Sequence, residues 1–99
     1  MNTQKEILDF LSLHKSFLEN RFHLSKIALF GSFSRNEATK TSDVDILIEL
    51  KEGTENVHDL KNELREYLST HLHRNVDLAR EKYLKPYAKE HILKDALYV

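Results

Sequence analysis

With 99 residues, the chain has the length of one small domain, which we expect to span residues 1–99. Its 15 Lys and Arg are balanced by 16 Asp and Glu, and the formal charge of -1 disfavours long nucleic acid as a direct partner, because phosphate-backbone contacts usually require a basic excess. The absence of Cys excludes disulfides and thiolate metal sites. No apolar run has the length of a signal peptide or a membrane span, so we expect a cytoplasmic protein.

The N-terminal part of the chain predicts one long helix and then a strand. Residues 3–22 carry apolar side chains at helical spacing, and Thr3 with Glu6 has the form of a capping box. Residues 26–31 are a short apolar run that ends in Gly31, which is typical of a buried strand followed by a turn.

The remainder predicts two further strands and two further helices. Residues 43–50 alternate between apolar and mostly polar side chains, which indicates a strand with one packed face. An apolar stripe over residues 57–68 predicts a second helix. Residues 75–79 are predicted to form a third strand, and residues 85–97 a last helix with Pro in its first turn. This order predicts an α/β (α+β) fold, a small mixed β-sheet with helices packed on one face.

Asp43 and Asp45 are the first candidate site residues. They stand two residues apart in a predicted strand, so both carboxylates leave the same face. Their like charges repel each other, and a divalent cation between them makes the arrangement favourable. Mg²⁺ is the natural ion, because it prefers oxygen ligands and completes its shell with water and substrate phosphates.

Gly31 and Ser32 stand where the first predicted strand should end. A Gly lets the backbone approach a phosphate closely, and free amides with a Ser hydroxyl can hydrogen-bond phosphate oxygens. The segment lacks both the P-loop pattern and the three-glycine dinucleotide fingerprint, so neither of those folds is indicated.

Asp77 is the only acidic residue of the third predicted strand. It stands between Val76 and Leu78, which should face the core, so its carboxylate should project to the open side of the sheet. Three carboxylates on neighbouring strands could hold two metal ions, one activating an attacking oxygen and one bridging the phosphates and the leaving pyrophosphate. Asp77 would also be the natural general base for an acceptor hydroxyl.

The spacing of these residues resembles the signature of the DNA polymerase beta-like nucleotidyltransferase superfamily, in which Gly-Ser is followed by a spacer and Asp-x-Asp. Residues 30–47 are similar to the motif of its smallest branch, the minimal nucleotidyltransferase (MNT) domain. Segments 75–78 and 84–86 resemble later parts of that family, so the similarity covers roughly residues 26–99. The resemblance implies a polymerase beta-like core. It also implies that magnesium binds Asp43, Asp45 and Asp77, and that the triphosphate binds Gly31 and Ser32.

The turn around Arg35 departs from the family motif. Ser34 and Asn36 stand where the family commonly has Ala and Gly, so we expect a less tight turn. Arg35 is a candidate for binding the triphosphate, and it could equally pair with Glu37 or a motif Asp to hold the turn.

The resemblance also implies a reaction and a partner. MNT proteins are commonly antitoxins of HEPN-domain ribonuclease toxins, and studied members adenylylate a tyrosine of the toxin. The chain would then use Mg²⁺ and ATP to transfer AMP to a HEPN toxin. Two alternatives remain open: a non-catalytic antitoxin that masks its partner, and an aminoglycoside-type enzyme that modifies a small molecule.

Overall fold

The computed structural model describes residues 3–99. The elements in chain order are α1 (Gln4–Leu13), α2 (Lys15–Phe22), β1 (Leu24–Phe30), β2 (Val44–Leu50), α3 (Val57–Leu72), β3 (Val76–Arg80), a 3-10 turn (Glu81–Tyr83), α4 (Pro86–Asp95) and β4 (Leu97–Tyr98). None of the helices in this part of the chain is long and apolar enough to cross a membrane.

The predicted N-terminal helix is two helices, α1 and α2, separated at His14. The backbone of His14 leaves helical geometry at φ -99 and ψ 7, and its ring Nδ1 lies 2.9 Å from the carbonyl oxygen of Phe10. Both helices nevertheless bury the same apolar stripe, because Leu11 and Leu18 are seven residues apart and both are fully buried. Thr3 is the N-cap of α1, as the capping-box pattern predicts: its hydroxyl accepts from the backbone N–H of Glu6 at 3.1 Å and donates to the Glu6 carboxylate at 3.1 Å.

The sheet has the order β3-β2-β1-β4. β1 runs antiparallel to both β2 and β4, whereas β2 and β3 are parallel and joined through α3. The short β4 corrects the prediction for the end of the chain, which extended the last helix to residue 97. Instead the helix ends at Asp95, and Leu97 and Tyr98 pair with Leu29 and Ala28 of β1.

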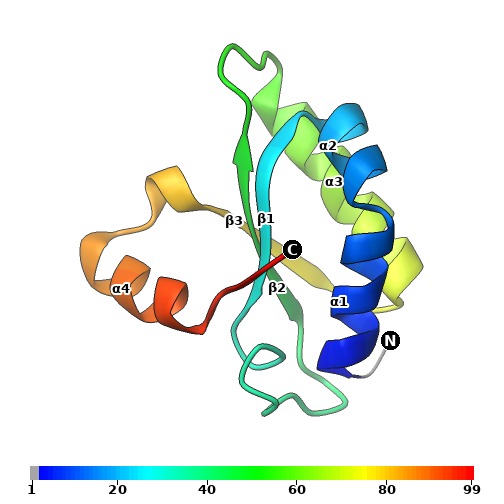
Figure 1. Cartoon of the computed structure of the whole chain (residues 1–99), viewed down its shortest axis with the longest axis vertical. Coiled ribbons are helices and arrows are strands. Elements are labelled where there is room, and N and C mark those ends of the chain that lie inside the picture. The colour runs from blue at the N-terminus through cyan, green and yellow to red at the C-terminus, as the bar shows by residue number, and fades with distance from the viewer. Residues whose placement is uncertain (1–2) are drawn as a thin grey trace.

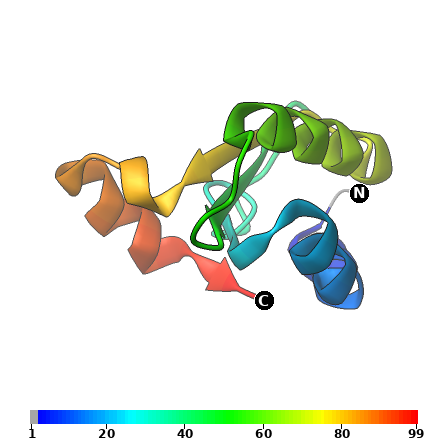
Figure 2. The same cartoon turned by 90° about the horizontal axis from the view of Figure 1, so that it is seen from above.

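The two faces of the sheet differ in their cover. On one face Val44, Ile46 and Ile48 of β2 are fully buried and belong to the hydrophobic core. Figures 1 and 2 show α1, α2 and α3 together on one side of the sheet. α4 lies on the other side of the sheet and contacts β1. That face carries the buried Leu47 and, at either end of the same strand, the polar residues Asp45 and Glu49.

Candidate active site

Asp45 and Asp77 are direct neighbours across the parallel pair of β2 and β3. The register pairs Val44 with Val76, Asp45 with Asp77 and Ile46 with Leu78. Because paired residues of adjacent strands share a face, both carboxylates leave the face opposite α1–α3. Asp45 is partly buried and Asp77 is exposed, so the pair forms a site that is open to solvent on the β3 side.

Asp43 stands immediately before β2 and is exposed. Burial raises the pKa of the Asp45 carboxyl, and the negative charges of Asp77 and Asp43 raise it further, while the positive charge of Arg35 opposes them. Asp43, Asp77 and Arg35 therefore all lie within electrostatic reach of Asp45, which makes it the centre of the candidate site.

Gly31 lies against the Asp45 carboxylate. It follows Phe30, the residue of β1 that pairs with Asp45, and its φ of +75 is in the left-handed region. A Cβ at position 31 would lie 2.1 Å from Oδ2 and 2.9 Å from Cγ of Asp45, so any side chain there would force the Asp45 carboxylate to move. Glycine is therefore required here for two reasons, the backbone conformation and the closeness of a carboxylate.

The turn that follows Gly31 is anchored in the core by Phe33, which is 1% exposed. Burial of a Phe side chain stabilises by roughly 1.5–3 kcal/mol. The side-chain amide of Gln4, at the start of α1, donates to the carbonyl oxygens of Phe33 and Ser34 at 3.3 and 2.9 Å. The turn is thus fixed both to the hydrophobic core and to the first helix.

Ser34 and Asn36, the two departures from the family motif, are both compatible with a closed turn. Asn36 adopts φ +57, the left-handed conformation in which Gly is favoured and Asn is tolerated. The Ser34 hydroxyl donates to the carbonyl oxygen of Gly31 at 2.8 Å, and the backbone N–H of Arg35 donates to the same oxygen at 3.3 Å. The turn therefore closes on itself despite the expectation of a looser one.

Ser32 occupies the turn next to Gly31. Its carbonyl oxygen accepts from the backbone N–H of Glu37 at 2.8 Å. Among residues 3–99 no group hydrogen-bonds its hydroxyl, so this oxygen is available to a ligand.

Arg35 pairs with two carboxylates. Its Nε donates to Glu37 at 3.1 Å and its Nη1 to Asp95 at 3.3 Å. The partner Glu37 was one of the sequence alternatives, whereas Asp95 was missed, because it lies sixty residues further along the chain and reaches Arg35 only through the fold.

Arg74 is a second residue that sequence reasoning missed. Its Nη1 donates to the carbonyl oxygens of Thr39, Lys40 and Ser42 at 3.2, 3.2 and 2.8 Å, and its guanidinium lies over the ring of Phe33. Arg74 therefore ties the loop before Asp43 to the start of β3. No local sequence pattern predicts hydrogen bonds from an Arg side chain to main-chain carbonyls.

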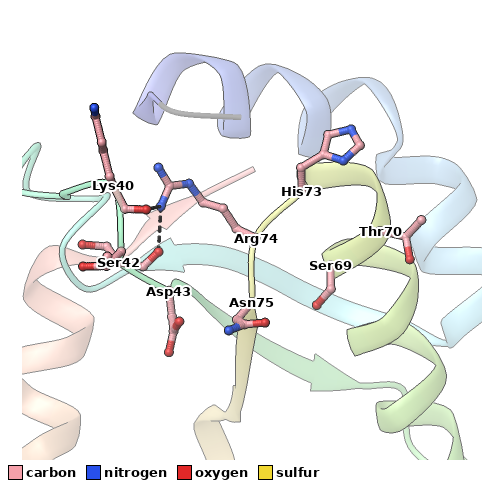
Figure 3. A pocket seen from close by; sticks show the side chains of 9 residues that line it. Lys40, Ser42, Asp43, Ser69, Thr70, His73, Arg74 and Asn75 are labelled. Atoms are coloured by element: carbon pink, nitrogen blue, oxygen red, sulfur yellow. Dashed lines mark hydrogen bonds between the residues drawn. The ribbon is translucent and has the colours of Figure 1, made fainter.

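A polar hollow of about 630 Å³ lies beside Asp43. Figure 3 shows its lining, which comes from the loop before β2, the last turn of α3 and the segment leading into β3. The lining residues are Lys40, Thr41, Ser42, Asp43, Ser69, Thr70, His73, Arg74 and Asn75. Asp43 thus borders both the carboxylate cluster and an adjacent polar surface.

The carboxylates suit magnesium in their donor chemistry. Within residues 3–99 no group of three or more His, Asp or Glu side chains is gathered closely enough to hold an ion by itself. Mg²⁺ however is usually held by one or two carboxylates together with substrate phosphates and water, rather than by a complete protein cage. Asp45 and Asp77 on adjacent strands, with Asp43 nearby, fit a site that the substrate completes.

A family model described as "Nucleotidyltransferase domain" matches residues 11–99 of this chain. A relative in Methanocaldococcus jannaschii, named "putative protein adenylyltransferase", is 42% identical over 100 residues, covering all of both chains. The protein adenylyltransferase MntA of Thermococcus cleftensis is 38% identical over 99 residues, covering all of this chain and 98% of the relative.

Two solved structures have a similar fold. One, titled "Structure of putative minimal nucleotidyltransferase", superposes with a TM-score of 0.80 at 26% identity, covering 96% of this chain and 94% of the other. Another, titled "Crystal structure of the toxin-antitoxin with AMP-PNP", has a TM-score of 0.67 at 23% identity and covers 96% of this chain and 70% of the other. The second likeness concerns the fold alone.

Proposed function

Because this chain belongs to the nucleotidyltransferase-domain family and is a nucleotidyltransferase, we propose that it transfers AMP from ATP to a tyrosine of a HEPN ribonuclease toxin and so acts as its antitoxin. One observation carries the enzymatic part: Asp45 and Asp77 are paired side by side, with Gly31 packed against the Asp45 carboxylate. A turn that can hold phosphates thereby meets carboxylates that can hold a cation.

Each residue of the site has a role in this reaction. The Gly31 turn, the Ser32 hydroxyl and Arg35 bind the triphosphate, while Asp43, Asp45 and Asp77 are the magnesium ligands. When bound, magnesium neutralises charge on the phosphates and the leaving group. The reaction belongs in the cytoplasm, where ATP is available.

The chemical step is a displacement at the α-phosphorus of ATP. The acceptor oxygen forms a new bond to this phosphorus, the bond to the bridging oxygen of the β-phosphate breaks, and pyrophosphate leaves. The proton of the acceptor hydroxyl passes to the carboxylate of Asp77, which is exposed on the edge strand and accessible to a second molecule. Bonds and charges balance without any further reactant.

The toxin as acceptor is supported by two observations. Relatives that match this chain over its whole length are named protein adenylyltransferases. A protein with the same fold has been solved as a toxin–antitoxin assembly with an ATP analogue. A protein acceptor also suits Asp77, which is exposed on the edge strand β3.

The test incubates the chain with its cognate toxin and ATP labelled at the α-phosphate, with Mg²⁺ or with EDTA. We expect covalent label on a toxin tyrosine, only with the metal, and loss of ribonuclease activity as label accumulates. Label that appears equally in EDTA would contradict the magnesium role. Full neutralisation without label would indicate instead an antitoxin that masks its partner.

A further inference from the structure

The guanidinium of Arg35 is held between carboxylates from two distant parts of the chain. Its Nε donates to Glu37 in the same loop, and its Nη1 donates to Asp95, the last residue of α4. Among residues 3–99 no group accepts a hydrogen bond from Nη2, and the Arg35 side chain is 42% exposed. The guanidinium is therefore held at two nitrogens, and within the described residues its third nitrogen has no protein acceptor.

Asp95 is brought to the turn by the sheet. Leu97 pairs with Leu29 and Tyr98 with Ala28, and the two strands run antiparallel. Because the strands are antiparallel, residues that precede Leu97 lie beside residues that follow Leu29. Asp95 is therefore placed beside the turn that begins at Gly31. The backbone N–H of Val99 also donates to the carbonyl oxygen of Ile27 at 3.2 Å, which fixes this segment further.

The Arg35–Asp95 contact contributes little to stability. Both side chains are substantially exposed, at 42% and 32%, and ion pairs of this kind are screened by water and salt. Its main physical effect is on the direction of the guanidinium. Arg35 lies close enough for its charge to act on Asp45, so this direction determines whether its free edge reaches a phosphate at the site.

We propose that Asp95 is a positioning residue for the nucleotide: through its hydrogen bond to Nη1 it holds Arg35 beside the Gly31 turn, with the Nη2 edge directed to the triphosphate. The inference rests on the proposed function and extends the nucleotide site to the segment of α4 and β4. A guanidinium that is already held loses less rotamer freedom when the phosphates arrive, which favours binding.

The first test measures KM and kcat for ATP, with Mg²⁺ and the toxin, in the variant Asp95→Asn. We expect KM to rise by about two- to fivefold, the range of an exposed ion pair, with kcat nearly unchanged. Asp95→Glu should restore part of the affinity, because it keeps the carboxylate. Glu90→Gln is the matched control: it removes the same charge from an exposed position of α4 and should leave KM unchanged.

The second test combines Asp95→Asn with Arg35→Ala. If Asp95 acts through Arg35, the double variant has the KM of Arg35→Ala alone. An effect of Asp95→Asn that persists without Arg35, a lowered KM, or an equal effect of Glu90→Gln would each overturn the inference. These results differ from failure of the proposed function, in which the unaltered chain transfers no label and the inference falls with it.

Discussion

At the scale of single residues, the site depends on how closely Gly31 approaches Asp45. The missing side chain at position 31 leaves room for the Asp45 carboxylate, and the left-handed backbone conformation of Gly31 sets the direction of the turn that follows. Gly53 offers a natural comparison, because it has nearly the same conformation at φ +78 but nothing within 4 Å of a Cβ placed there. A substitution at Gly53 therefore tests backbone strain alone, whereas one at Gly31 adds crowding of the Asp45 carboxylate.

We predict that Gly31→Ala reduces AMP transfer strongly, whereas Gly53→Ala leaves it nearly unchanged. Both variants should lose about 1 kcal/mol of unfolding free energy, because an L side chain is strained at positive φ. Only Gly31→Ala also forces the Asp45 carboxylate to move. Transfer assays and urea unfolding of both variants test this, and equal activity of the two would argue against the role given to Gly31.

At the scale of elements, Glu49 joins β2, β3 and the 3-10 turn at the end of the sheet away from Asp45. Its Oε1 accepts two hydrogen bonds from Arg80, at 3.1 and 2.8 Å, and its Oε2 accepts from the backbone N–H of Lys82 at 3.0 Å. Burial acts to raise the pKa of Glu49, but these hydrogen bonds together with one from the Leu50 N–H outweigh it, so the pKa is lowered. The carboxylate form of Glu49 is therefore stabilised by folding.

We predict that Glu49→Gln lowers the unfolding free energy by about 1–2 kcal/mol at about pH 7, because bonds to the charged group are lost. Because the pKa of Glu49 is lower in the folded state, its carboxylate stabilises the protein at pH values above its unfolded-state pKa, near 4.5. This contribution disappears as the pH falls through the folded-state pKa. The difference between the two proteins should thus shrink in urea titrations below about pH 4.5.

Asp9→Asn serves as the control for this prediction. It breaks an ion pair with Lys5 in which the side chains are 65% and 84% exposed, so we expect a change below about 0.5 kcal/mol. A loss from Glu49→Gln that is no larger, or one that stays constant down to acidic pH, would contradict the stabilising role of the carboxylate.

The sequence predicts elements whose pattern is local. The alternation along residues 43–50 identifies β2 and its inward face, and the apolar stripe of residues 57–68 identifies α3, although this helix continues to Leu72. The break at His14 is not apparent, because Leu11 and Leu18 keep one helical face across it. The strand β4 is missed since it is two residues long and is defined by pairing with β1.

The same limit applies to the candidate site. Asp43, Asp45, Gly31 and Ser32 belong to one motif with fixed spacing, and the strand pattern places Asp77 on the same face as Asp45, as the register shows. Arg74 and Asp95 act through contacts with loops that are distant in sequence. Such contacts depend on tertiary packing, which periodicity and spacing do not encode.

At the scale of the whole molecule, the sheet separates stability from chemistry. The face beneath α1, α2 and α3 carries the core, and the opposite face carries the carboxylates at the ends of β2 and β3. Removing charge from that open end should therefore change activity without loss of the fold. Asp45 is disfavoured as a carboxylate by burial and by its acidic neighbours, so its charge serves function at a cost in stability.

The most direct measurement is the rate of AMP transfer from labelled ATP to the toxin by Asp43→Asn and Asp45→Asn, beside thermal unfolding of each variant in EDTA. The amide keeps the size of the side chain and removes the charge that holds magnesium, so each rate should fall by at least about 100-fold. Asp9→Asn, on the exposed face of α1, should transfer at the normal rate. Unfolding temperatures should not decrease, and that of Asp45→Asn should increase slightly. Transfer by either site variant at a rate near that of the unaltered protein would contradict a mechanism based on these carboxylates.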